Sequence, residues 1–254
     1  MRHAGVYIGK CMDKVIHRSG SRGYSDNGWL KTYYTFSCAN YYDPRRINFG
    51  ALRVLNDDTI EGGEGLKSHP HDNMEIVFIP LEGSIDHGDS LGNFVTVSPG
   101  EAQIMSSGTG MFHNEYNHSA DKPVKYVQMW IFPREYEVMP SYSHVKLADA
   151  GRNNWQAVVS PEGGEHVLPI NQHAWVYMAD MDAGHVMTHL LHNEDNGVYV
   201  FVLAGEVFID GNVLQQRDAI GLPFMRTVDV EAREDSKILL IEVPMRKWSS
   251  TKDL

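Results

Sequence analysis

Short apolar runs separated by turn-forming residues dominate the chain from residue 47 onward. The runs are rich in Val, Ile, Tyr and Phe, and Gly, Pro, Asn or Asp bounds them about every 8–12 residues, which is typical of a β-sandwich or barrel. Short helices are expected only near 133–140 and in the C-terminal tail. The predicted strands cover residues 47–55, 74–83, 93–100, 102–108, 124–133, 155–160, 174–181, 185–191, 198–211, 219–223, 227–232 and 237–244.

Two of these strand pairs follow the same plan. "MEIVFIPLEGSIDHG" and "VYVFVLAGEVFIDG" each contain an apolar run, a glycine turn and a second strand that ends near Asp and Gly. The turn glycines, Gly83 and Gly205, are 122 positions apart, about half the chain. We therefore predict a duplicated all-β unit. The weak strand character of 134–155 places the boundary there, with units of 1–140 and 141–254.

Composition narrows the class of protein without naming a function. The 254 residues are 42% hydrophobic and 22% charged, as in an ordinary globular protein, and the net charge of −11 argues against direct binding of nucleic acid. Two cysteines, Cys11 and Cys38, are too few for a disulfide framework. We see no apolar core of a secretory signal and no run of roughly 18 apolar residues. The chain is expected to be cytoplasmic, without membrane contact.

Two pairs of potential metal ligands stand out among the thirteen histidines. His69 and His71 are two apart, so in a strand both imidazoles point to the same side; His113 and Glu115 repeat that spacing. If both strands face one cavity, three imidazoles and a carboxylate meet. Such a set suits a divalent transition metal such as iron and leaves positions open for water, substrate or oxygen. The scattered histidines are expected to lie at the surface or in hydrogen bonds, for example His87, His144 and His173.

The segments around these pairs resemble the cupin motifs. "GEGLKSHPHDNMEIVFIPLEG" matches the first motif, with His-x-His, a later glutamate and a glycine-ended strand, and "GMFHNEYN" matches the end of the second. More narrowly, four segments in order resemble the pirin family, and they cover most of residues 28 to 133. They are "GWLKTYYTFSCANYYDP", "FGALRVLNDDTIEGGEGLKSHPHDNMEIV", "GEAQIMSSGTGMFHNEYN" and "VQMWIFP".

This resemblance implies an all-β bicupin: two tandem jelly-roll type β-barrels with few short helices. It implies a metal-binding N-terminal barrel in 1–140, with Fe²⁺ held by the residues that match the family's ligands. Mn, Co, Ni, Cu and Zn are the other metals that such a site accepts. Glu75 holds the place of a glutamate ligand used by many other cupins, and we expect it to support the site or to lie on the strand surface. The matching ligands are His69, His71, His113 and Glu115.

The C-terminal half lacks the same motif. His185, His189 and His192 are four and three residues apart, and "DAIGLPF" contains no histidine. The spacing of His185 and His189 suits a helix, whereas the local pattern predicts a strand. We therefore expect the barrel in 141–254 to lack a metal and to serve as a structural partner.

Two functional readings remain open, and the resemblance supplies both. The first is a quercetin 2,3-dioxygenase type of oxidoreductase, in which the metal binds the 3-hydroxyl of a flavonol or a related aromatic substrate, Glu115 accepts its proton, and oxygen then cleaves the heterocycle. The second is an iron-binding transcriptional cofactor that acts through protein partners. A sugar isomerase or epimerase ranks last, because no cluster of Lys and Arg is placed to hold a sugar phosphate. We expect a monomer.

Overall fold

Residues 13–246 are described by the computed structural model, and they form twenty-two strands and one short 3-10 turn, η1 (Ser19–Ser21). The predicted all-β class is confirmed. The expected C-terminal helix and Cys11 lie outside the described residues. No helix within 13–246 has the length and apolar character needed to cross a membrane.

The segment 133–140 is a loop and not the short helix expected from the sequence. Glu137 has a φ of 56°, in the left-handed region that interrupts a right-handed helix. The side chain of Asn73 fixes this conformation, because its Nδ2 donates to Glu137 Oε1 at 2.6 Å and its Oδ1 accepts from the Glu137 backbone N–H at 2.7 Å. Tertiary hydrogen bonds therefore outweigh local helix propensity here.

The first barrel is built from a seven-stranded and a four-stranded sheet, antiparallel throughout. The larger sheet has the order β12 (Ser141–Lys146), β9 (Glu101–Ser106), β6 (Glu75–Glu82), β11 (Val124–Ile131), β4 (Leu52–Ile60), β3 (Leu30–Tyr34) and β2 (Gly23–Asp26). The smaller sheet has the order β5 (Gly65–His71), β10 (Met111–Asn117), β7 (Ile85–Asp89) and β8 (Phe94–Val97).

The second barrel repeats this plan. Its seven-stranded sheet has the order β1 (Val15–His17), β20 (Ala219–Pro223), β17 (Asn196–Ala204), β22 (Ser236–Pro244), β15 (Trp175–Met181), β13 (Gln156–Ser160) and β14 (Leu168–Pro169). Its four-stranded sheet has the order β16 (Val186–Leu190), β21 (Thr227–Ala232), β18 (Glu206–Ile209) and β19 (Asn212–Gln215).

The two turn glycines found in the sequence occupy equivalent places. Gly83 links β6 to β7 and Gly205 links β17 to β18, with φ values of 72° and 79°. A Cβ at Gly205 would lie 2.4 Å from the backbone oxygen of Asp235, so both the left-handed backbone and the close approach require glycine. The internal repeat is thus visible in the strand order and in its turns.

Strand pairing crosses the boundary expected at residue 140. β1 belongs to the sheet of the second barrel, where Ile16 is paired with Ile220. β12 lies after residue 140 yet pairs with β9 of the first barrel, with Val145 opposite Ala102. Neither strand was expected from the sequence, because β1 has three residues and β12, "SYSHVK", is mostly polar. The division into 1–140 and 141–254 stays a prediction about domains.

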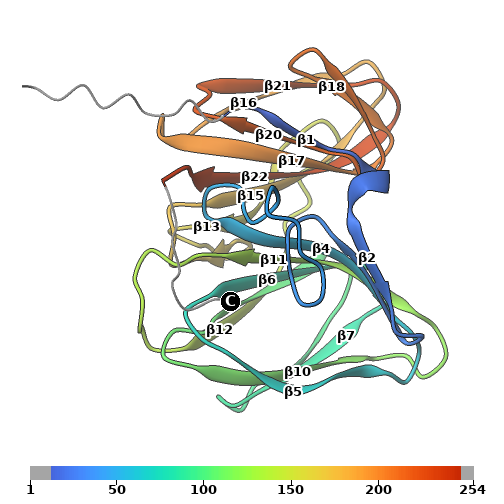
Figure 1. The fold of residues 1–254 in the computed structure, drawn as a ribbon, viewed down its shortest axis with the longest axis vertical. Helices are drawn as coiled ribbons and strands as arrows, with labels where there is room; N and C mark the ends of the chain where they lie inside the picture. Colours follow the sequence, from blue (N-terminus) through green and yellow to red (C-terminus); the bar gives the residue numbers. More distant parts are fainter. Residues whose placement is uncertain (1–12, 247–254) are drawn as a thin grey trace, which may run out of the picture.

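The two seven-stranded sheets pack against each other in the middle of the molecule, and the four-stranded sheets lie outside them (Figure 1). One apolar cluster spans the contact and includes Leu55, Met129, Tyr199, Phe201 and Ile241. A second cluster fills the second barrel. Burial of apolar surface on this scale is the main favourable term in folding, so the contact between the barrels is part of the core.

Phe49 shows how tight this contact is. Its ring is 3% exposed and lies against two glycines of the second barrel, Gly197 and Gly221. A Cβ at Gly221 would meet Phe49 Cε2 at 2.6 Å and Val15 Cγ2 at 2.8 Å.

We predict that Gly221→Ala lowers the free energy of unfolding by about 1–3 kcal/mol, because the added methyl group overpacks the core. Chemical denaturation measures the change. Gly164→Ala is the matched control, since its Cβ would meet no atom closer than 3.8 Å. Equal stability of the two variants would show that Phe49 moves freely.

Candidate metal centre

β5 and β10 place the predicted ligands on the inner face of the four-stranded sheet. His69 is paired directly with His113, and His71 with Met111. Along β10 the residues alternate between buried and more exposed, and His113 and Glu115 are both buried. The pairing shifts between His113 and Glu115, which is a local β-bulge. These side chains therefore point inward because successive residues of a strand face opposite sides of the sheet.

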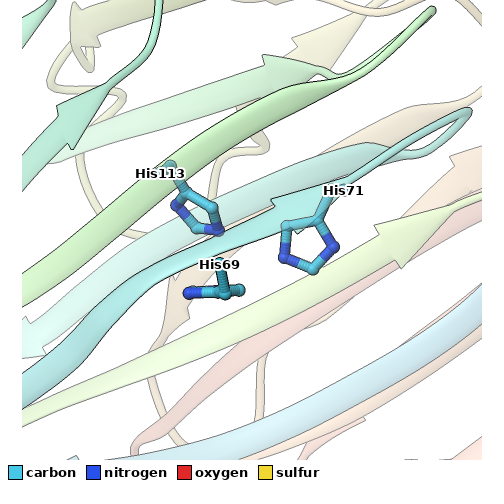
Figure 2. Close-up of side chains that lie close together, drawn as sticks. All are labelled: His69, His71 and His113. Carbon is cyan, nitrogen blue, oxygen red and sulfur yellow. The ribbon is translucent and has the colours of Figure 1, made fainter.

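Three imidazoles meet at this point. The ring centroids of His69 and His113 are 4.3 Å apart, and that of His71 lies 5.0 Å from each of them. One ring nitrogen from each histidine lies within 4.8 Å of the others. Figure 2 shows the three rings converging from β5 and β10 on one small volume.

Neighbouring groups fix two of these rings. His69 Nδ1 lies 2.8 Å from the backbone oxygen of Lys67, so Nδ1–H donates to it and Nε2 is left with a free lone pair. The ring of His71 contacts Trp130 edge-on at 4.8 Å. Burial, and then the neighbouring His113 and His69, lower the pKa of His71 to about 3. It is therefore neutral at pH 7, as a metal ligand must be.

His113 and Glu115 lie deepest in the site, and both side chains are fully buried. His113 Nδ1 is 3.0 Å from Glu115 Oε1. Within residues 13–246, neither ring nitrogen of His113 and neither oxygen of Glu115 has a partner with hydrogen-bond geometry. Four buried polar atoms without hydrogen bonds at one place are rare in a folded protein, and these donor atoms fit a site that binds an ion.

Further polar groups lie behind Glu115. Burial is the main cause that raises the pKa of Asp58 to about 7, and the charges of Asp57 and Glu115 add to it. Burial also raises the pKa of Tyr126 well above its usual value, and Asp58 and Glu115 contribute to that shift. The part of the first barrel next to Glu115 thus contains further buried acidic and hydroxyl groups within an otherwise apolar core.

His87, expected from the sequence at the surface or in a hydrogen bond, lies next to the site. Its side chain is fully buried, its Nε2 lies 3.1 Å from Asp89 Oδ2, and its ring stacks on Tyr142 at 4.5 Å. A ligand atom of His87 lies within 4.8 Å of those of His113 and Glu115. The sequence could have indicated this position, because side chains two residues apart in a strand point to the same face. Ile85 is buried, so His87 on the same strand also points inward.

Glu75 lies elsewhere. It is 1% exposed, and its carboxylate accepts from Ser106 Oγ at 2.7 Å and from the backbone N–H of Asn171 at 3.1 Å. It ties the first barrel to the loop between β14 and β15 of the second barrel, so the surface position considered from the sequence is wrong. His173 is exposed, as expected from the sequence, and His144 Nε2 lies 3.4 Å from Glu101.

Family models match both halves of the chain. Residues 16–131 match the model described as Pirin, and residues 157–243 match the model described as Quercetinase C-terminal cupin domain. The two matches follow the two barrels, in agreement with the bicupin architecture expected from the resemblance.

Similar proteins cover nearly the whole chain. Quercetin 2,3-dioxygenase of Escherichia coli strain K12 is 37% identical over 233 residues, which are 90% of this chain and 98% of that protein. A pirin-like protein of Caulobacter vibrioides is 35% identical over 222 residues, 87% of this chain and 95% of that protein.

Among solved structures, a bacterial pirin from Escherichia coli in complex with nickel(II) superposes with a TM-score of 0.87 at 36% identity. That match covers 92% of this chain and all of the other. Together with the strand order and the converging histidines, these matches show that the chain belongs to the pirin family, as a bicupin related to bacterial quercetin 2,3-dioxygenases.

Proposed function

We propose that this protein is a metal-dependent dioxygenase of the quercetin 2,3-dioxygenase type, which cleaves a flavonol or a related aromatic molecule at one metal ion in the first barrel. The ligands are His69, His71, His113 and Glu115, and the physiological metal is Fe²⁺. The observation that carries this proposal is the set of buried atoms on His113 and Glu115 that lack hydrogen bonds. A cytoplasmic location and a monomeric state stay predictions.

The residues present fit a divalent metal by their chemistry as well as by their position. Three imidazoles and one carboxylate suit a borderline transition metal, and the carboxylate offsets part of its charge. The Lys67 carbonyl holds Nδ1–H of His69 and so leaves the Nε2 lone pair free for a metal. The nickel(II) complex of the Escherichia coli pirin supports a divalent ion in this fold.

A divalent metal acts as a Lewis acid and lowers the pKa of a hydroxyl group that binds it. The side chains around the site then handle the proton. Glu115 is the candidate base for the substrate hydroxyl. His87 is close to Glu115 and is paired with Asp89, so it offers the next position for that proton. Trp130 packs on His71 and limits how that ring rotates.

Partial exposure of two ligands supports access by a substrate. His69 and His71 are half-buried, whereas His113 and Glu115 are fully buried, so a substrate would reach the metal past the two histidines of β5. The proposed substrate class itself rests on the related quercetin 2,3-dioxygenase of Escherichia coli.

One observation favours a second function, that of an iron-binding cofactor which acts through a protein partner. Phe94 and Phe112 are 83% and 55% exposed on the outer face of the four-stranded sheet. Both rings lie beside Gly88 of β7. Phe94 on β8 is paired with Gly88 on one side, and on the other side Gly88 is paired with Asn114 of β10, two residues after Phe112. Exposed aromatic pairs of this kind are typical of contact surfaces.

We predict that His69→Ala removes the metal of the first barrel and abolishes metal-dependent oxygen uptake, because the ring supplies an oriented ligand. The experiment combines metal analysis, circular dichroism and an oxygen electrode with quercetin as the probe. His173→Ala, an exposed histidine, is the control and should behave as the wild type. Unchanged metal content in His69→Ala would contradict the ligand assignment. Full metal content without oxygen uptake in the wild type would favour the partner-binding function.

We predict that Glu115→Gln slows oxygen uptake by about 10²–10⁴-fold, since it removes the candidate base and a negative ligand while it keeps the side-chain shape. Initial rates at matched metal loading measure this effect. Glu82→Gln is the matched control, because the Glu82 side chain is exposed and its Oε2 pairs with Lys125 Nζ at 2.8 Å on the protein surface. Wild-type rates in Glu115→Gln would exclude Glu115 as base.

A further inference from the structure

The second barrel contains a compact cluster of His189, His192 and Glu242, and we propose that it is a second binding site for a divalent transition metal ion. The cluster lies apart from the first site, on β16, on β22 and on the segment between β16 and β17. One ligand atom of each side chain lies within 4.8 Å of the other two. This proposal departs from the expectation that the second barrel lacks a metal, and it does not depend on the proposed activity.

The spacing of the donor atoms suits a metal ion. Glu242 Oε2 lies 2.8 Å from His189 Nε2 and 2.9 Å from His192 Nδ1. Metal–nitrogen and metal–oxygen bonds of about 2.0–2.2 Å put neighbouring ligand atoms roughly 2.9–3.5 Å apart, so little movement is needed to admit an ion. Two imidazoles and one carboxylate are a donor set for zinc, iron(II), cobalt(II) or nickel(II), with positions left for water.

Surrounding residues hold the ligands in place. Glu242 Oε1 accepts from Asn196 Nδ2 at 2.7 Å and from the backbone N–H of His192 at 2.8 Å, which leaves Oε2 directed at the two rings. The ring of His192 stacks on Trp175 at 4.1 Å with an interplanar angle of 3°, and its Nε2 lies 3.3 Å from the Tyr177 hydroxyl. Ligands of metal sites are commonly oriented by such outer contacts.

The cluster occupies the mouth that corresponds to the first site. β16 pairs with β21 as β5 pairs with β10. Glu242 stands between Val198 and Trp175, at the position that Trp130 has between Ile76 and Val54 in the first barrel. Trp130 is the residue that contacts His71, so the second barrel has a carboxylate where the first has an indole.

Access from solvent differs among the three ligands. The side chains of Glu242 and His189 are 0% and 5% exposed, whereas that of His192 is 35% exposed. An ion can therefore enter past His192 and meet two ligands that are already fixed. His185, which also suggested a ligand pair in the sequence, is exposed and lies outside the cluster.

The test is the number of Zn²⁺ ions bound per chain after metal removal and equilibrium dialysis against Zn²⁺. We expect two in the wild type, one in His192→Ala, one in His69→Ala and none in the double variant. His185→Ala is the matched control and should bind as many Zn²⁺ ions per chain as the protein into which it is introduced. Glu242→Gln, which keeps the shape of the side chain, should also lose one ion and guards against a folding defect in His192→Ala.

His192→Ala is introduced both into the wild type and into His69→Ala, and the number of Zn²⁺ ions lost is measured in each. The result for the second site is therefore independent of the first site. If His69→Ala keeps its full count while His192→Ala loses one ion, the first-site assignment fails and the second-site proposal stands. Unchanged counts in both His192→Ala and Glu242→Gln would overturn the second site and leave the cluster as a hydrogen-bond network.

Discussion

Alternation of side chains along the β5–β10 pair is the constraint on which the site depends. His69 and His113 are directly opposed, and the residues two positions away, His71 and Glu115, must share their side of the sheet. The same alternation sends Phe112 to the outer surface. A shift of β5 by one residue against β10 would turn His69 and His71 outward while β7 keeps His113 and Glu115 inside, so the register of this strand pair decides whether the potential ligands meet.

That register is held by the rest of the barrel. Asn117, at the end of β10, donates through Nδ2 to the backbone oxygens of Ile60 and Lys122, which fixes the strand against the larger sheet. Gly65 lies so close to β10 that a Cβ there would meet the Glu115 backbone oxygen at 2.4 Å. The larger sheet is in turn fixed by its apolar contact with the second barrel. The second barrel therefore contributes rigidity to a site that it does not touch.

The sequence predicted the features that depend on local patterns. Alternating apolar residues located most strands after residue 47, and the spacing of His69 with His71 and of His113 with Glu115 identified the residues that converge or lie next to one another. What it missed depends on tertiary context. His87 and Glu242 have no motif around them, β1 is too short to show a pattern, and β12 has too few apolar residues to show one. The loop at 133–140 is held by hydrogen bonds from Asn73, which is distant in the sequence, so local propensities could not predict it.

The first strand gives the chain a particular order of assembly. β1 completes the edge of the second barrel by pairing with β20, while β2 and β3, which follow it directly, belong to the first barrel. During synthesis β1 leaves the ribosome on the order of 200 residues before its partner exists, and closing so long a loop is slow and costly in entropy. The first barrel can form meanwhile, whereas the edge of β20 is covered only at the end. Pairing of β1 therefore has to wait until most strands of both barrels have been made.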